Sequence, residues 1–313
     1  MNQDRWHPEM RAARAHMDAE AAKLPPVTLT EPFGPSRAVN EQLAMLYGHG
    51  GPTMAESTER WLMLRGRRVL CRIHKPRTDA MLPVLVWFHG GGWVFQSIDS
   101  HDRLVRELSA AGDVASVSVD YSLAPESRFP QPLLECADAV RALAEVDWGF
   151  DGSRIVVGGD SAGGNLAFAT AIHLRDAGGP KLRGILTPYP VTDADFTSPS
   201  YREFAEGFSL TTAGMRAYWD LYTNNAADRL NPLAAPLRAD YAGLPPGFIQ
   251  LAELDVLRSD GERMAAKMQA AGVECRIETY DGMLHGFMRL TEAVATARSA
   301  VADAGAWLRA VTG

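Results

Sequence analysis

The sequence predicts an α/β fold in which a mostly parallel central sheet is flanked by helices. From about residue 60, short apolar segments alternate with segments of helical periodicity, a pattern typical of a doubly wound parallel sheet. Residues 84–88 are continuously apolar, as expected of a strand that is covered on both faces. Residues 155–158 form another apolar segment, and a short turn of small and polar residues joins it to a helical segment that begins at Ala162.

The remaining elements follow in order along the chain. Two helical segments are expected within the first 50 residues, at about 8–24 and 39–47, with a loop rich in proline and glycine between them. Strands are expected at 69–73, 84–88, 114–119, 155–158, 184–187, 248–251 and 275–280. Helices are expected at 102–111, 132–145, 162–176, 258–271 and 293–311. Residues 195–222 interrupt this alternation with aromatic side chains and a helix, which indicates an insertion.

The composition excludes several classes of protein. The 313 residues are 46% hydrophobic and 22% charged, so the chain is neither wholly disordered nor a collagen or coiled coil. The net charge is −7 and no cluster of Lys and Arg is present, which argues against binding to nucleic acid or to anionic membranes. The N-terminus has no apolar signal region, and no apolar run approaches the ~18 residues of a membrane span.

Cysteine usage points to a reducing compartment. Cys71, Cys136 and Cys275 are far apart, and no Cys-x-x-Cys or Cys/His cluster occurs. The sequence therefore predicts core thiols rather than a disulfide framework or a zinc site, and we expect no metal. Together with the missing signal region, this predicts a cytoplasmic protein.

The strongest functional motif is Gly159-Asp160-Ser161-Ala162-Gly163, a G-x-S-x-G sequence between a predicted strand and a predicted helix. A serine at the apex of such a turn has strained dihedrals, and its hydroxyl is lifted above the edge of the sheet. The alternative interpretation is a turn of small residues with an inert serine. The strand–turn–helix context favours Ser161 as a nucleophile.

A second motif, His89-Gly90-Gly91-Gly92-Trp93, follows the predicted strand 84–88. Its glycines allow backbone N–H groups to turn inward, where they could stabilise a developing oxyanion. A flexible loop and a phosphate-binding loop are the alternatives. A dinucleotide-binding loop would continue as G-x-G-x-x-G into a helix, whereas this one continues into bulky Trp93-Val94-Phe95.

A serine nucleophile needs an imidazole as base and a carboxylate that orients the imidazole. Asp255 lies just beyond the strand predicted at 248–251, and His285 lies just beyond the strand predicted at 275–280. The order Ser, Asp, His is the one in which α/β-hydrolases carry these groups. Glu253 and Asp260 are alternative acids, although Asp260 is expected in the first turn of the helix at 258–271, where a carboxylate favours the helix dipole.

Taken together, these segments resemble the hormone-sensitive lipase-like esterases, bacterial family IV of the α/β-hydrolase fold. The matching segments are His89-Gly90-Gly91-Gly92-Trp93, Asp120-Tyr121-Ser122-Leu123-Ala124-Pro125-Glu126, Gly159-Asp160-Ser161-Ala162-Gly163-Gly164-Asn165, Asp255-Val256-Leu257-Arg258 and His285-Gly286-Phe287. They occur in the family order and cover about residues 60–310. Two positions depart from the usual pattern: Val256 replaces a proline, and Ser122 replaces an arginine whose ion pair must be absent or replaced here.

The resemblance implies a catalytic triad of Ser161, Asp255 and His285. It assigns the oxyanion hole to the N–H groups of Gly91, Gly92 and Ala162. It also implies structural roles for His89, Asp160 and Glu126.

A helical cap over the site is a further implication of the resemblance. Residues 1–50 would form its N-terminal part, and an insertion at about 195–225 would complete it within the catalytic domain of residues 51–313. This insertion is rich in aromatic residues, and bulky side chains also follow the oxyanion glycines. We therefore expect Trp93, Phe208 and Trp219 to bind substrate, because such pockets are mostly apolar.

The predicted function is that of a serine carboxylesterase that cleaves short-to-medium acyl esters through an acyl-enzyme. An amide or formamide hydrolase with the same triad is the first alternative. A non-catalytic small-ligand receptor is the second, although the presence of His285 argues against it. We expect no cofactor and a small-molecule ester as partner, with neither nucleic acid nor membrane, and a homodimer as a possible assembly.

Overall fold

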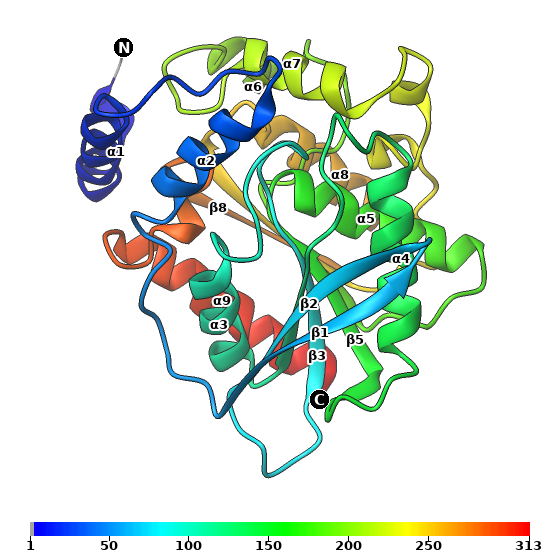
Figure 1. Ribbon diagram of the computed structural model, residues 1–313. Helices are drawn as coiled ribbons and strands as arrows, with labels where there is room; N and C mark the ends of the chain where they lie inside the picture. Colours follow the sequence, from blue (N-terminus) through cyan, green and yellow to red (C-terminus); the bar gives the residue numbers. More distant parts are fainter. Residues whose placement is uncertain (1–2) are drawn as a thin grey trace.

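The computed structural model describes residues 3–313 and contains an eight-stranded sheet at its centre (Figure 1). The strand order is β1-β2-β4-β3-β5-β6-β7-β8. The strands are β1 (Glu56–Leu64), β2 (Arg67–Lys75), β3 (Pro83–Phe88), β4 (Ala115–Val119), β5 (Asp151–Gly159), β6 (Gly184–Pro188), β7 (Gly247–Leu254) and β8 (Cys275–Leu284). Strands β3 to β8 are parallel, and β2 is antiparallel to both of its neighbours. The sheet is therefore mostly parallel, as the sequence predicts.

Every expected strand is present, and the sheet contains one more. Strand β1 lies at the edge of the sheet, its first five residues are polar, and two of its four apolar residues, Trp61 and Met63, are exposed. The inner strand β3, by contrast, is buried along its whole length. The difference explains why periodicity predicts β3 and misses β1.

Helices cover both faces of the sheet. Helices α3 (Asp102–Gly112) and α9 (Ala295–Thr312) pack together on one face. On the opposite face, α4 (Gln131–Leu143) packs on α5 (Ala162–Asp176), and α8 (Arg258–Ala270) packs on β7. The arrangement of the helices around the sheet can be followed in Figure 1. Buried apolar side chains fill the space between these layers and form one continuous core.

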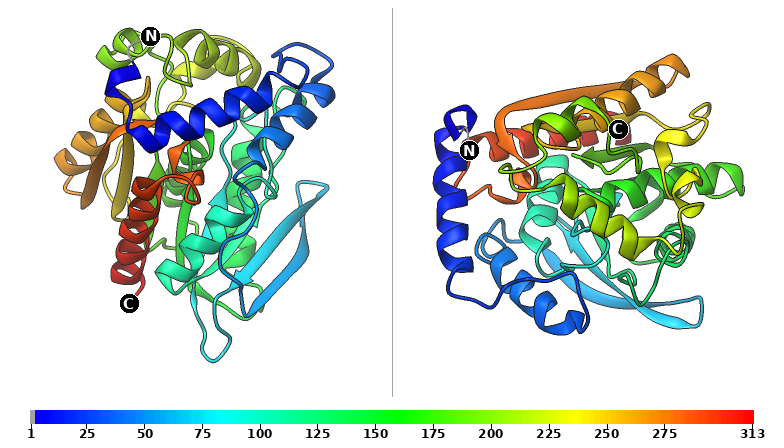
Figure 2. Two further views of the ribbon diagram at one scale, coloured as in Figure 1. Left: turned by 90° about the vertical axis from the view of Figure 1, so that its left-hand side faces the viewer. Right: turned by 90° about the horizontal axis from the view of Figure 1, so that it is seen from above.

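The N-terminal helices and the insertion lie at the same end of the molecule. In the left view of Figure 2, the blue N-terminal segment lies beside the yellow-green segment, well away from the C-terminus. The N-terminal segment contains η1 (Gln3–Arg5), α1 (Pro8–Ala21) and α2 (Phe33–Ala44), and the insertion contains α6 (Pro199–Glu203) and α7 (Thr212–Tyr222). Helix α2 starts earlier than the expected residue 39, because Pro35 falls in its first turn, where proline is tolerated.

Three short 3₁₀ helices complete the structure. They are η2 (Asp228–Leu230), η3 (Pro236–Arg238) and η4 (Phe287–Arg289). Across residues 3–313, none of the helices combines the length and the apolar character that crossing a membrane requires.

Candidate functional site

Ser161 sits in a sharp turn between β5, which ends at Gly159, and α5, which begins at Ala162. Its backbone dihedrals are φ 55° and ψ −118°, a strained conformation that L-residues rarely adopt. The turn needs small neighbours, because a Cβ atom at Gly163 would overlap the carbonyl oxygen of Phe88. The sequence thus places the Ser161 side chain at the carboxyl edge of the sheet, on a rigid backbone.

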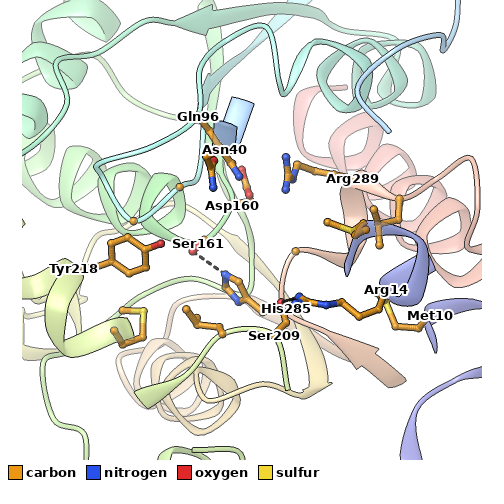
Figure 3. Close-up of a pocket in the computed structure, with 17 residues that line it drawn as sticks. Met10, Arg14, Asn40, Gln96, Asp160, Ser161, Ser209, Tyr218, His285 and Arg289 are labelled. Carbon is orange, nitrogen blue, oxygen red and sulfur yellow. Dashed lines mark hydrogen bonds between the residues drawn. The ribbon is translucent and has the colours of Figure 1, made fainter. Parts of the chain in front are cut away.

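Ser161, His285 and Asp255 form a hydrogen-bonded chain. The distance from His285 Nε2 to Ser161 Oγ is 2.9 Å (Figure 3), and the distance from His285 Nδ1 to Asp255 Oδ2 is 2.6 Å. The other carboxylate oxygen of Asp255 accepts a hydrogen bond from the Leu257 N–H at 3.1 Å. This buried carboxylate therefore fixes the orientation and the tautomer of the His285 imidazole. Nδ1 donates its hydrogen to Asp255, and Nε2 is left to accept the serine proton.

The alternative acids lie elsewhere. Glu253 accepts a hydrogen bond from the Gly282 N–H at 2.7 Å and pairs with Arg5 at 3.2 Å. Asp260 is buried in the first turn of α8, where burial raises its pKa well above the usual range. Neither carboxylate is hydrogen-bonded to His285 within the described residues.

Two of the three predicted oxyanion donors line the same space, and the third, Ala162, follows Ser161 directly. Gly91 and Gly92 adopt φ values of 108° and 62°, which favour glycine, and both line a pocket together with Ser161 and His285. Ala162 is the first residue of α5, so its N–H has no partner within the helix. Within residues 3–313 these three N–H groups donate no hydrogen bond, and they remain available to an oxyanion.

A buried polar cluster supports the glycine loop. Asp160 Oδ1 lies 3.0 Å from His101 Nε2 and accepts a hydrogen bond from the Gly90 N–H, also at 3.0 Å. Burial alone would raise the pKa of Asp160, but the charge interaction and hydrogen bond with His101, with a contribution from Arg289, lower it to about 2. Asp160 is therefore ionised at neutral pH and fixes the loop through Gly90.

His89 is also buried in this cluster and stays neutral. Its Nδ1 donates to the Gly90 carbonyl oxygen at 2.7 Å, and its ring stacks on Tyr121 with 4.5 Å between centroids. Burial, with the charge of His101 adding to it, lowers the pKa of His89 to about 3. These contacts tie the loop to the core and agree with a structural role for His89.

We expect His89 to make the folded protein less stable as the pH falls below about 6.5. The unfolded chain binds a proton at this imidazole near its ordinary pKa of about 6.5, whereas the folded chain does not bind one until about pH 3. Because the unfolded state then binds more protons, the free energy of unfolding falls by up to about 1.4 kcal/mol per pH unit. When urea unfolding is compared at pH 6.5 and pH 5, the free energy of unfolding of wild type should fall by about 1.6 kcal/mol more than that of His89→Gln. His49→Gln, which changes an exposed histidine, is the control. Equal losses of stability in wild type and His89→Gln would contradict this assignment.

The structure shows the surroundings of the two positions that depart from the motifs. Ser122 donates to Glu135 Oε1 at 2.8 Å, and Arg67 of the neighbouring strand β2 hydrogen-bonds Ser122 and approaches Glu135 at 3.7 Å. Arg67 thus provides the guanidinium that the motif lacks at position 122. Val256 is fully buried, and its carbonyl oxygen accepts a hydrogen bond from Ser200 Oγ at 2.6 Å.

Glu126 links the N-terminal segment to the glycine loop. Arg37 of α2 forms two hydrogen bonds of 2.6 Å with its carboxylate. The same guanidinium donates to the carbonyl oxygens of Val94 and Ala124, both at 2.9 Å. Glu126 therefore has a structural function at the border of the site.

A pocket of about 290 Å³ opens above Ser161. Besides the catalytic candidates and the glycine loop, α1, α2, α7 and η4 contribute to its wall. The lining residues are Met10, Arg14, Met17, Asn40, Gly91, Gly92, Gln96, Asp160, Ser161, Ser209, Leu210, Met215, Tyr218, His285, Gly286, Arg289 and Leu290.

The three predicted substrate-binding aromatics are not among these residues. Trp93 and Trp219 are fully buried and pack on each other, and Trp93 also stacks on Tyr222 with 4.2 Å between centroids. Phe208 packs against Trp6 and Phe204 instead. The expectation for these three residues therefore needs correction: they pack the insertion against the core. Trp219 points into the core, and its neighbour Tyr218 on α7 points about 100° away from it and faces the pocket.

Within residues 3–313, no three His, Cys, Asp or Glu side chains lie close enough together to hold a metal ion. All three cysteines are free thiols, with Cys71 and Cys136 buried.

Comparisons with known proteins identify the family and several relatives of this chain. An alpha/beta hydrolase fold family matches residues 85–289. The chain is 40% identical over 225 residues to carboxylesterase NlhH of Mycobacterium tuberculosis, with 70% of each protein covered. It is 32% identical over 279 residues to an ethyl acetate hydrolase of Pseudomonas putida, covering 86% of this chain and 87% of that protein. Among solved structures, a thermostable esterase from Pseudomonas putida superposes with a TM-score of 0.90 at 36% identity, covering 97% of both chains.

Proposed function

The chain belongs to the alpha/beta hydrolase fold family as a hormone-sensitive lipase-like esterase, and we propose that Ser161, His285 and Asp255 perform its ester hydrolysis. The observation that supports these roles most strongly is the continuous hydrogen-bonded chain from Ser161 Oγ through His285 to Asp255. This chain of nucleophile, base and carboxylate is the arrangement through which a serine performs nucleophilic acyl transfer.

Each group has one task in the proposed mechanism. Ser161 Oγ attacks the ester carbonyl carbon while His285 Nε2 accepts its proton. The carbonyl oxygen becomes an oxyanion that accepts hydrogen bonds from the N–H groups of Gly91, Gly92 and Ala162. His285 then donates the proton to the leaving alcohol, and an acyl-enzyme remains. Water, deprotonated by His285, repeats the attack and releases the acid.

We propose that residues 1–50 and the insertion at about 195–225 act as the cap of the catalytic domain. This division is supported by the pocket wall, to which α1 contributes Met10 and Met17, and α7 contributes Met215 and Tyr218. In place of the aromatics expected from the sequence, we propose Tyr218, Met215 and Leu210 as the apolar contacts of the substrate. A cytoplasmic location and a homodimer remain predictions from the sequence.

A matched pair of substrates tests ester against amide hydrolysis. We expect p-nitrophenyl butyrate to be hydrolysed and the p-nitroanilide of the same acid to be hydrolysed far more slowly, because an anilide has a poorer leaving group. Release of nitrophenol and nitroaniline provides the two rates. An anilide rate equal to or above the ester rate would favour the amidase, and no turnover of either would favour the ligand receptor.

The length of the acyl chain should have a defined optimum. Each methylene contributes about 0.8 kcal/mol while the pocket has room, and overpacking costs about 1–3 kcal/mol once the chain reaches the wall. For p-nitrophenyl esters we expect kcat/KM to rise from acetate, to peak between butyrate and octanoate, and to fall steeply beyond. Efficient hydrolysis of palmitate, with a jump in rate above the solubility limit, would mean that the insertion is a mobile lipase lid.

A further inference from the structure

The pocket has an apolar side and a polar side. In Figure 3, Tyr218 lies on one side of Ser161, and Arg289 and Arg14 lie on the other. Met215 accompanies Tyr218 on α7, whereas Asn40 also lines the pocket with a side-chain oxygen that is buried and unpaired. Hydrolysis of a plain alkyl ester uses none of the polar groups on the second side.

Arg289 is the most unusual of these groups. It lies at the end of η4, four residues after His285, and its guanidinium is only partly exposed. Its Nη1 atom is buried and has no hydrogen-bond partner, and within residues 3–313 the guanidinium forms no hydrogen bond or ion pair. A guanidinium carries five N–H donors in a planar fork that matches a carboxylate, so a partly buried one without partners is suited to bind an anion.

Neighbouring charges do not satisfy Arg289. Asp160 also lines the pocket, and its carboxylate is held by His101 and by the Gly90 N–H, both at 3.0 Å. Arg289 acts on Asp160 electrostatically, without direct contact. Arg14 differs from Arg289, because it pairs with Asp18 at 2.7 Å and hydrogen-bonds Ser209 at 3.0 Å. Arg289 is therefore the cation in this pocket wall that is free to take a ligand.

We propose that Arg289 binds a carboxylate in the alcohol portion of the ester, so that the preferred substrates are anionic esters such as acetoxy acids. The proposal rests on the proposed function, because His285 must protonate the leaving alcohol. That alcohol therefore lies beside His285, and the turn after His285 carries Arg289. The opposite side, where Tyr218 approaches Gly92, is left for the acyl group.

The test compares two substrates that differ only in charge, 4-acetoxybutanoate and 4-acetoxybutanamide, and measures the release of acetate. A charge-assisted hydrogen bond to carboxylate corresponds to about 10- to 100-fold in kcat/KM. We expect wild type to prefer the anion and Arg289→Gln to lower the ratio of anion to amide by about 10- to 100-fold. Arg289→Lys should retain part of the preference. Arg14→Gln removes the same charge from the same pocket and should change the ratio by less than about threefold, because Arg14 is already paired.

A second pair of substrates distinguishes the two portions of the ester. Monoethyl succinate carries its carboxylate in the acyl portion, and ethyl succinamate is its neutral counterpart. If Arg289→Gln lowers the ratio for this pair and leaves the acetoxy pair unaffected, the assignment to the alcohol portion is overturned. A ratio that is unchanged for both pairs overturns the anion site and leaves Arg289 as a structural countercharge for Asp160.

Inhibition of wild type provides a test that does not depend on the folding of a variant. With p-nitrophenyl acetate as substrate, 4-hydroxybutanoate should inhibit competitively at a concentration about 10-fold lower than 4-hydroxybutanamide, and added salt should reduce this difference. Equal inhibition by both compounds overturns the inference. Absence of p-nitrophenyl acetate hydrolysis in wild type would instead contradict the proposed function itself, so the two failures are distinguishable.

Discussion

Replacing Ser161 with alanine should reduce ester hydrolysis by about four to six orders of magnitude and leave the fold intact. The variant loses the oxygen that forms the acyl-enzyme, whereas His285, Asp255 and the backbone N–H donors stay in position. A small residual rate over water is therefore expected, from substrate binding and the oxyanion hole alone. Alanine has the same backbone requirements as serine at φ 55°, so the turn should form equally well. Turnover of p-nitrophenyl butyrate and the circular dichroism spectrum provide the measurements.

Covalent labelling identifies the nucleophile independently of turnover. An organophosphate should label wild type once, at Ser161, and should not label Ser161→Ala. Ser153→Ala removes a hydroxyl that only bonds Asp151 at the protein surface, and this control should be labelled and active like wild type. Stoichiometric labelling of a different serine would show that Ser161 is not the nucleophile.

The triad candidates could be found from the sequence because each follows a predictable element. Ser161 is bounded by an apolar strand and a helix, and Asp255 and His285 each follow a late strand. Their side chains meet because the carboxyl ends of parallel strands lie at one edge of the sheet. The choice of Asp255 over Glu253 rests on the resemblance of Asp255-Val256-Leu257-Arg258 to the acid loop of the family, because the order of the triad residues permits either carboxylate. The 2.6 Å contact between Asp255 and His285 supports that choice.

The wall of the pocket could not be predicted in the same way. Tyr218 and Trp219 are adjacent aromatic residues on α7, and the sequence gives no reason to prefer one of them. Only the rotation of α7 against the core decides which of them faces Ser161. The contribution of α1 depends on contacts between segments far apart in sequence, as in the 3.0 Å hydrogen bond from Arg14 to Ser209. No local pattern encodes such contacts.

The replacement of the missing motif arginine is a further long-range feature. Arg67 lies on β2, whereas Ser122 lies in the loop after β4, and the Arg67 guanidinium hydrogen-bonds Ser122 and approaches Glu135. Arg67 lies just before the strand predicted at 69–73, and its sequence context does not indicate this contact. The substitution at position 122 could be seen in the sequence, and its compensation required the structure.

Replacing Asp255 with asparagine should lower turnover by up to about 10⁴-fold. The amide can still accept the hydrogen bond from the Leu257 N–H, so the local geometry should survive. Its NH₂ group, however, can donate to His285 Nδ1, which favours the tautomer that carries its proton on Nε2. That proton points at Ser161 Oγ, 2.9 Å away, and an Nε2 that is already protonated cannot accept the serine proton. The loss should therefore appear in kcat, measured with p-nitrophenyl butyrate.

The two alternative acids provide matched controls for this prediction. Glu253→Gln removes the charge paired with Arg5 and can keep the hydrogen bond from the Gly282 N–H, so most of the activity should remain. Asp260→Asn removes an acid in α8 that does not contact His285, and it should affect the stability of the helix rather than kcat. If Asp255→Asn were nearly as active as wild type and either control were inactive, the imidazole would be oriented by a different carboxylate. The distinction is sharp because an amide at the true position changes the tautomer of His285, whereas an amide elsewhere leaves the tautomer as it is.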